Sequence, residues 1–359
     1  MGIHCVSGLE KPPNIDIWDI DETCKPHLPV LQKAYNDVAV MAAKALEDIQ
    51  FVQQPRPQYN TRSNKRMQWD RIARAMKCMF GFMPGEQGTD KYMARVLYVY
   101  QTMNEALRGD HNLPKDGFTK RHNKALWLCD DKLWKWHHSG MSDPNNPSLL
   151  PLFQSREDIM KGKKGVWIYR DRYITNDDSR SPGICGPDSH AKTHVKYDMI
   201  TFCPTSFTGK VAKAESPVDG KNGVVVGKNL DEFGRYSLSR IMFHELVHWY
   251  GSKGVERQKR LIDQQAVSKT GQLMWFRKNG ERFEKEAAPE RPDKSWNALN
   301  TYYFGWVEML ARRYDGAVAQ NSGPGKATET AEAYAYFAMM AYLDNFDWAV
   351  DGLAKHMEL

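Results

Sequence analysis

The pair of histidines in the segment His244-Glu-Leu-Val-His248 constrains this chain more than any other feature. Histidines four residues apart project from the same face of an α-helix, one turn apart, so both imidazoles can reach one Zn²⁺ at about 2.0–2.1 Å. Glu245 directly follows the first histidine, where it can take a proton from a zinc-coordinated water. The pattern therefore predicts a helix carrying two zinc ligands, His244 and His248, and a general base, Glu245.

The sequence around the motif supports a helix. Ser237 is a suitable N-cap, and Gly251 is a plausible residue just beyond the C-terminal end. Apolar residues between them recur at helical spacing and give a face for the core: Leu238, Ile241, Met242, Leu246 and Trp249. In the alternative interpretation, the two histidines and Glu245 are a solvated helix face. The apolar pattern and the two caps favour metal binding over that alternative.

Composition narrows the class of protein. Of the 359 residues, 41% are hydrophobic and 26% are charged, which is typical of a soluble globular chain. No apolar run approaches the 18 or so residues of a membrane span, so no membrane partner is predicted. The net charge is +6, but basic residues are scattered among acids, so no nucleic-acid partner is predicted either. None of the six cysteines forms a CxxC pair, which disfavours a cysteine zinc site.

Periodicity predicts an α+β fold in one domain, residues 1–359, with a helical N-terminal half (1–124) and a second half (125–359) that holds the histidine helix. Helices are expected at 29–51, 65–80, 90–108, 296–313 and 326–346. Strand formers predict strands at 125–129, 165–174 and 199–203. We expect residues 205–235 to be a surface loop with one short strand at 224–226.

Four segments follow one another in a specific order. They are Asp-Met-Ile-Thr-Phe-Cys-Pro-Thr-Ser-Phe (198–207), the histidine motif (244–248), Tyr-Phe-Gly-Trp (303–306) and Thr-Ala-Glu-Ala-Tyr-Ala-Tyr-Phe-Ala (330–338). This order resembles the deuterolysin-like aspzincin metallopeptidases of fungi and bacteria. The resemblance implies a zincin-like metallopeptidase fold, mainly helical with a small sheet packed against the histidine helix. It also implies one Zn²⁺ per chain and a protein or peptide substrate.

The chain departs from the family pattern at two positions. Thr301 stands where the family has its third zinc ligand, an aspartate. Phe304 replaces the family tyrosine that steadies the transition-state oxyanion. The neighbouring Tyr302 and Tyr303 could take over that role, and Tyr303 is the candidate we place in the site. In the last segment, Glu332 could hold a ligand histidine through a hydrogen bond.

The third ligand is therefore open among three residues. Asp263 lies fifteen positions after His248, where some family members place a ligand aspartate. Glu308 is two helical turns beyond the Thr301 position, and a rise of about 11 Å is too far for one extra methylene to recover. Asn300 is next to that position, but a neutral amide oxygen is a weak zinc ligand. Asp263 is the first choice, followed by Glu308 and then Asn300.

Two functions fit these residues. The first is a zinc-dependent endopeptidase, in which Glu245 is the general base and Tyr302 or Tyr303 stabilises the oxyanion. The second is a catalytically degenerate zinc-binding or interaction protein on a peptidase scaffold. The replaced aspartate and tyrosine favour the second function, whereas the intact Glu245 favours the first, because a protein that only binds zinc has no need of a base.

The resemblance also bears on location, because the family pairs cysteines at the positions of Cys185 and Cys203. We therefore expect a disulfide here and a secreted protein. The start, Met1-Gly-Ile-His-Cys5, lacks a charged region followed by an apolar one. Either the chain has no leader or a signal peptide has been removed, and the expected secretion favours removal. The oligomeric state is not indicated by the sequence.

Overall fold

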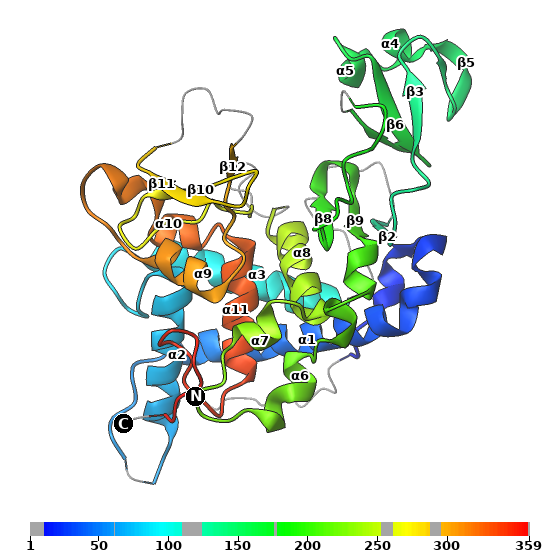
Figure 1. Ribbon diagram of the computed structural model, residues 1–359. Coiled ribbons are helices and arrows are strands. Elements are labelled where there is room, and N and C mark those ends of the chain that lie inside the picture. The colour runs from blue at the N-terminus through cyan, green and yellow to red at the C-terminus, as the bar shows by residue number, and fades with distance from the viewer. Residues whose placement is uncertain are drawn as a thin grey trace. The chain divides into compact units, whose positions relative to one another are not determined.

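The computed structural model of the chain describes residues 11–60, 62–109, 124–175, 178–252, 261–287 and 296–357. It is 45% helical and 17% strand, with the strands in small sheets, so the expected α+β class is confirmed. The chain packs as two compact units (Figure 1). Unit 1 holds Met1–Ile17, Leu31–Asp116 and Ala214–Leu359, and unit 2 holds Trp18–Val30 and Gly117–Lys213. The expected single domain stays a prediction, and the start of the chain, including Cys5, lies outside the described residues.

Unit 1 is mainly helical. Its helices are α1 Leu28–Val52 (from Leu31 onward), α2 Lys65–Phe80, α3 Asp90–Leu107, α6 Pro217–Gly220, α7 Asp231–Gly234, α8 Leu238–Ser252, α9 Phe304–Ala311, α10 Pro324–Ala327 and α11 Ala331–Tyr342. Short 3-10 helices add Ile15–Ile17, Lys221–Gly223 and Gly316–Asn321. A three-stranded antiparallel sheet completes the unit, in the order β11 Arg282–Lys285, β10 Leu273–Arg277, β12 Trp296–Ala298. No described helix of the chain is long and apolar enough to cross a membrane.

The core of unit 1 is organised around α11. Every residue of this helix from Ala331 to Ala341 is buried, and Glu332 is its only charged residue. A helix that is apolar on all sides must be surrounded by other elements, and α11 packs against α8, α2 and α9 (Figure 1). The ring of Tyr100 on α3 lies 6.3 Å from Phe243 of α8 and 5.9 Å from Phe337 of α11, so aromatic packing joins these three helices.

The helices expected near the N-terminus are confirmed, but two C-terminal expectations are wrong in part. Residues 296–313 do not form one helix, because Trp296–Ala298 pairs with β10 as β12 and the helix begins only at Phe304. Residues 326–346 form α10 and α11 with a break between them. Sheet pairing and tertiary packing have overridden a helical pattern in the first case.

The region 205–235 also differs from the expected loop with a strand. It contains α6 and α7, and residues 224–226 are not a strand. Val225 and Val226 are 64% and 54% exposed, and Gly227 turns the chain with a φ of 85°. Valine favours strands only where its side chain can pack on a neighbour, and here both side chains face solvent.

Unit 2 is built from small sheets. The first has the order β1 Asp19–Ile20, β2 Leu126–Leu128, β9 Met199–Phe202, β8 Ala191–His194, with β1, β2 and β9 parallel. The second is antiparallel, in the order β3 Lys135–His138, β6 Gly165–Tyr169, β7 Arg172–Ile174. A third pairs β4 Ser142–Asp143 with β5 Asn146–Pro151. Residues 165–174 are thus a hairpin and not one strand. The helices are α4 Leu152–Ser155 and α5 Glu157–Met160, with 3-10 turns at Glu22–His27, Val195–Tyr197, Pro204–Phe207 and Val211–Lys213.

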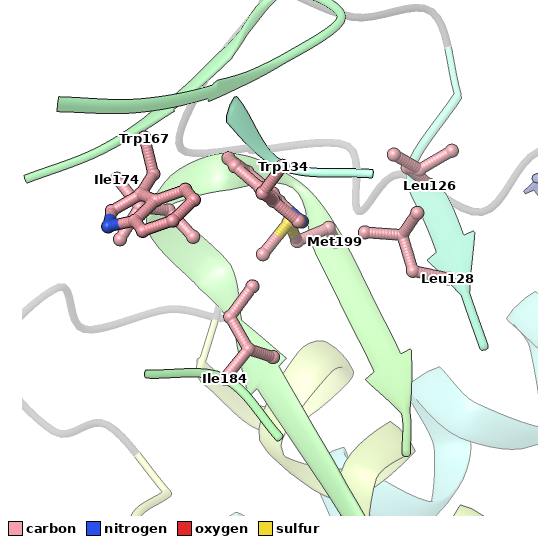
Figure 2. Close-up of a cluster of buried hydrophobic side chains, with 7 residues drawn as sticks. All are labelled: Leu126, Leu128, Trp134, Trp167, Ile174, Ile184 and Met199. Carbon is pink, nitrogen blue, oxygen red and sulfur yellow. The ribbon is translucent and has the colours of Figure 1, made fainter. Parts of the chain in front are cut away.

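A buried cluster joins the first two sheets of unit 2 (Figure 2). Leu126 and Leu128 are two positions apart on β2, so their side chains share one face of the strand. Trp167 and Ile174 come from the hairpin of β6 and β7, and Met199 comes from β9. The cluster gives both sheets a common apolar core, which short strands need because an isolated hairpin is only marginally stable.

Two disulfides hold unit 2. Cys185 bonds to Cys203, as the resemblance implied, and Cys24 bonds to Cys129, which the sequence analysis did not foresee. Cys78 of unit 1 is buried as a free thiol. Structural disulfides are typical of chains exposed to an oxidising compartment.

We expect the two disulfides to differ in their effect on stability. Cys24–Cys129 spans 105 residues and Cys185–Cys203 spans 18. A crosslink that closes a longer loop restricts the unfolded chain more, by about 4–5 kcal/mol for a loop of this size against about 3 kcal/mol for the short one. Denaturant unfolding of the two double cysteine-to-alanine variants should therefore show the larger loss for Cys24/Cys129. An equal or reversed order would contradict this account.

Candidate metal centre

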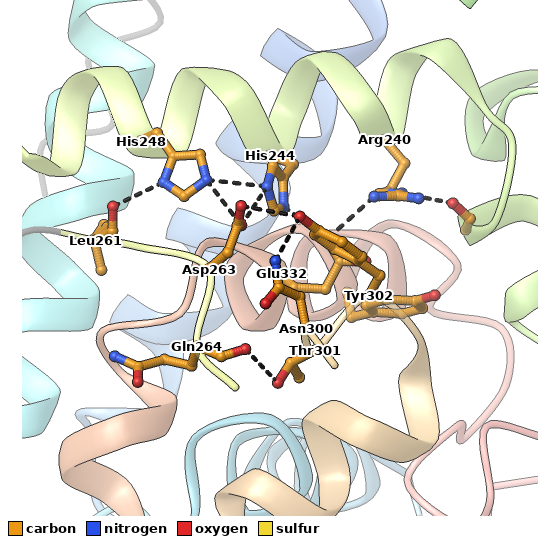
Figure 3. A network of polar contacts seen from close by, with 12 residues as sticks. Arg240, His244, His248, Leu261, Asp263, Gln264, Asn300, Thr301, Tyr302 and Glu332 are labelled. Carbon is orange, nitrogen blue, oxygen red and sulfur yellow. Dashed lines mark hydrogen bonds and ion pairs between the residues drawn. The ribbon is translucent and has the colours of Figure 1, made fainter. Parts of the chain in front are cut away.

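The two histidines lie on one face of α8. This helix begins directly after Ser237, and its apolar residues Met242, Leu246 and Trp249 are fully buried, while α11 and α3 pack against it. His244 is 6% exposed and His248 12% exposed, so neither is a solvated residue. Their rings lie 4.6 Å apart, with both Nε2 atoms directed toward Asp263 (Figure 3).

Three side-chain atoms form a small triangle. His244 Nε2 lies 3.0 Å from His248 Nε2, and Asp263 Oδ1 lies 3.0 Å from the former and 3.1 Å from the latter. Adjacent ligands of a tetrahedral zinc are about 3.3 Å apart when each is about 2.0–2.1 Å from the ion. Among the residues described, this is the group of His, Cys, Asp and Glu side chains that could hold a metal ion.

The hydrogen bonds behind the histidines decide which ring atoms face the triangle. His248 Nδ1 is 2.7 Å from the carbonyl oxygen of Leu261, which can only accept, so Nδ1 carries the proton. His244 Nδ1 is 2.7 Å from Glu332 Oε2 and donates to this carboxylate in the same way. When both imidazoles are neutral, their Nε2 atoms present lone pairs, and Asp263 adds a third acceptor. Three acceptors about 3 Å apart repel one another unless a cation, either a proton or a metal ion, lies among them, so the residues fit a metal ion.

Charge explains how the buried carboxylate behind His244 is tolerated. Glu332 is fully buried, and Arg240 Nη1 lies 3.1 Å from its Oε2. Burial would lower the pKa of His244, but the carboxylates of Asp263 and Glu332 raise it to about 10. Burial would raise the pKa of Asp263, but the two imidazoles hold it well below its usual range. The site therefore attracts positive charge, which a bound metal would supply in place of the proton.

Backbone hydrogen bonds bring Asp263 to the histidines. The N–H of Ile262 donates to the carbonyl of Glu329 at 3.0 Å, which ties the segment to the chain just before α11. The backbone N–H and the hydroxyl of Thr301 both donate to the carbonyl of Gln264, at 3.0 and 2.9 Å. Thr301 is thus a buried anchor for the segment that carries Asp263.

Gly251 allows that segment to approach α8 closely. It was expected just beyond the helix, but α8 as described runs to Ser252, so Gly251 lies inside it. A Cβ atom at this position would lie 1.9 Å from Leu261 Cδ1 and 2.9 Å from its Cγ. The absence of a side chain lets Leu261 pack on the helix, where its carbonyl meets His248.

Tyr302, and not Tyr303, reaches the cluster. The hydroxyl of Tyr302 donates to Asp263 Oδ2 at 3.0 Å, and its ring lies 6.0 Å from that of His244. Burial and the charge of Asp263 raise its pKa. Asn300 donates to the same hydroxyl at 3.1 Å. The ring of Tyr303 lies instead 5.0 Å from the guanidinium of Arg235.

The two glutamates considered for the site, Glu245 and Glu308, lie in different surroundings. Glu245 is 5% exposed on α8, and its charge contributes to the raised pKa of Tyr302. Glu308 accepts a hydrogen bond from Arg312 at 2.6 Å and lines a different pocket of unit 1, with Cys78 among others. The structure therefore brings together His244, His248 and Asp263, but not Glu308.

Sequence reasoning missed Arg240 and the carbonyl of Leu261. Arg240 lies four residues before His244, so helical spacing alone puts the two on one face of α8. The helical spacing could therefore have indicated Arg240. No sequence pattern could have indicated the Leu261 carbonyl, because every residue has a carbonyl and only the fold brings this one to His248.

The fold and this geometry stand without support from known proteins. No protein-family model matches the chain, and neither a curated protein nor a solved structure matches it significantly.

Proposed function

We propose that this protein is a zinc-dependent endopeptidase with His244, His248 and Asp263 as its zinc ligands. The observation that carries the proposal is the triangle of three acceptor atoms, with Glu245 next to the first histidine on the same helix. Two histidines and one carboxylate are the ligands of several catalytic zinc sites, which leave the fourth position open. The order of motifs that resembles the aspzincins points to the same function.

The side chains have distinct roles in this proposal. Zinc, when bound, would supply Lewis acidity to a water molecule and to the scissile carbonyl. Glu245 takes the proton of the attacking water and passes it to the leaving amine. The hydroxyl of Tyr302 would turn its single proton from Asp263 Oδ2 to the developing oxyanion, in the role for which Tyr303 was first considered. Glu332 and the Leu261 carbonyl keep the protons of both histidines on Nδ1, so that Nε2 faces the ion.

The proposed setting is extracellular. The two disulfides of unit 2 are compatible with secretion, because such bonds persist in oxidising compartments. A protein or peptide outside the cell is the proposed substrate.

We expect purified protein to bind one zinc per chain, and the double variant His244→Ala/His248→Ala to bind none. Asp263→Ala should weaken zinc binding by at least about 10-fold, the size of effect that even a disturbed hydrogen-bond partner of a ligand has. Glu308→Ala is the matched control, because this carboxylate pairs with Arg312 away from the cluster, and it should stay within a few-fold. Metal analysis and competition with a chelator provide the measurements. Stoichiometric zinc in the double histidine variant would exclude the site.

Glu245→Gln should abolish hydrolysis of a general protein substrate while the zinc content stays unchanged. The amide keeps the shape of the side chain but cannot take a proton, and loss of a general base costs about 10²–10⁴-fold in rate. Release of labelled peptides from casein, at equal zinc occupancy, measures this effect. If zinc-loaded wild-type protein cleaves nothing, the non-catalytic zinc-binding function is the better one.

Tyr302→Phe should lower kcat by about 10²-fold or more with a small change in KM, because it removes a donor to the oxyanion. Tyr303→Phe is the matched control and should stay within a few-fold. Zinc content is measured in both variants, since the Tyr302 hydroxyl also bonds Asp263. A larger loss for Tyr303→Phe would reverse the assignment.

A further inference from the structure

Arg235 is an arginine held in place by aromatic rings. Its guanidinium carbon lies 5.2 Å from the ring centre of Tyr236 and 5.0 Å from that of Tyr303, both within the range of a cation–π contact. Its backbone is fixed as well. The N–H donates to the carbonyl of Asp231 at 2.9 Å, and its own carbonyl accepts from Arg240 Nη2 at 3.3 Å. Contacts on both rings and on the backbone limit where the side chain can point.

No carboxylate of the described residues neutralises Arg235, although the side chain is exposed to solvent. The contrast with Arg240 is clear, because that guanidinium is buried and paired with Glu332. Asp231 Oδ1, one turn before Arg235, accepts from the hydroxyl of Tyr336 and from the backbone N–H of Phe304. Glu232 Oε1 accepts from the backbone N–H of Asn229. Aromatic rings stabilise a guanidinium cation but leave its N–H groups available to donate hydrogen bonds to a ligand.

Arg235 is adjacent to the residues of the metal centre. Tyr303, on which it stacks, directly follows Tyr302, whose hydroxyl bonds Asp263. Its carbonyl belongs to the chain of contacts that runs through Arg240 and Glu332 to His244. The inference requires that a peptide bound across the cluster extends toward Tyr303, and such a peptide advances about 3.3 Å per residue.

The balance of charge also favours an acidic ligand. With zinc bound, the charges of the ion and of Arg240 would offset those of Asp263, Glu245 and Glu332. Arg235 then adds a positive charge next to Tyr303, and no carboxylate of the described residues forms an ion pair with it. A positive group without a partner at the rim of a site attracts carboxylates and repels basic segments.

We propose that Arg235 is a specificity-determining residue that selects peptides with a carboxylate a few residues from the bond placed at the metal centre. The inference rests on the proposed function, since it assumes that a peptide binds across this centre. The carboxylate is either an acidic side chain or the free carboxyl terminus of the peptide. The guanidinium takes it through a bidentate pair of hydrogen bonds, which a lysine ammonium cannot reproduce.

Binding to zinc-loaded Glu245→Gln protein tests the inference without requiring hydrolysis. The first probe is a fluorescein-labelled octapeptide amide that alternates alanine with glutamate, and its twin alternates alanine with glutamine. A third probe is the glutamine peptide with a free carboxyl terminus. Fluorescence anisotropy at constant ionic strength gives the three dissociation constants, first with Arg235 intact, then with Arg235→Gln and Arg235→Lys added.

With Arg235 intact, we expect a carboxylate-bearing probe to bind about 10-fold or more tightly than the glutamine amide, the size of one charge-assisted hydrogen-bonded contact. Tighter binding of the glutamate peptide would identify a side-chain carboxylate as the group that Arg235 binds, and tighter binding of the free-acid peptide would identify the carboxyl terminus. The preference should vanish in Arg235→Gln and survive in part in Arg235→Lys, at unchanged zinc content. Equal binding of all three probes by the protein with Arg235 intact overturns the inference, and so does an unchanged preference in Arg235→Gln.

The same experiment separates this inference from the proposed function. Discriminating binding by Glu245→Gln protein, together with a wild-type protein that cleaves none of the probes or casein, would support the role of Arg235 and reject the peptidase. Cleavage of casein by wild type with no preference among the probes would support the peptidase and reject the role of Arg235.

Discussion

The candidate site depends on one buried interaction, the contact of Glu332 with His244 and Arg240. Removing a carboxylate from water costs several kcal/mol unless charges and hydrogen bonds replace its hydration. Here Arg240 supplies the opposite charge and His244 supplies a proton donor, both on Oε2. Because Glu332 lies on the otherwise apolar α11 and its two partners lie on α8, the packing of these two helices also sets the orientation of the His244 ring.

Asp263 reaches the two histidines through backbone contacts and not through a helix. Asp263 lies on an irregular segment held by Glu329 on one side and by Thr301 on the other. This arrangement gives a physical role to Thr301. Its hydroxyl holds the neighbouring carbonyl of Gln264, and the carboxylate of Asp263 comes from the segment that it holds. A threonine at position 301 is therefore compatible with three acceptor side chains in the cluster.

The sequence predicted what local periodicity determines. The helix with His244 and His248 follows from spacing, and α1, α2 and α3 follow from apolar residues at helical intervals. Asp263 was ranked first because the chain from His248 to this residue is short. Pairings between distant segments were not predictable in the same way, so the Cys24–Cys129 disulfide and the pairing of Trp296 with β10 were missed. Which of Tyr302 and Tyr303 reaches the cluster was likewise not predictable, because adjacent residues ahead of a helix point in different directions that only the fold defines.

Gly251 sets a limit on how stable this region can become. Glycine inside a helix costs about 0.5–1 kcal/mol relative to alanine, so replacing it is a common route to a more thermostable protein. At this position an added methyl would push Leu261 off the helix, and the Leu261 carbonyl is the group that fixes the proton of His248. A gain in helix stability would thus be coupled to a loss of order in the His248 ring. The last described turn of α8 therefore keeps a weak helix former where Leu261 approaches the helix closely.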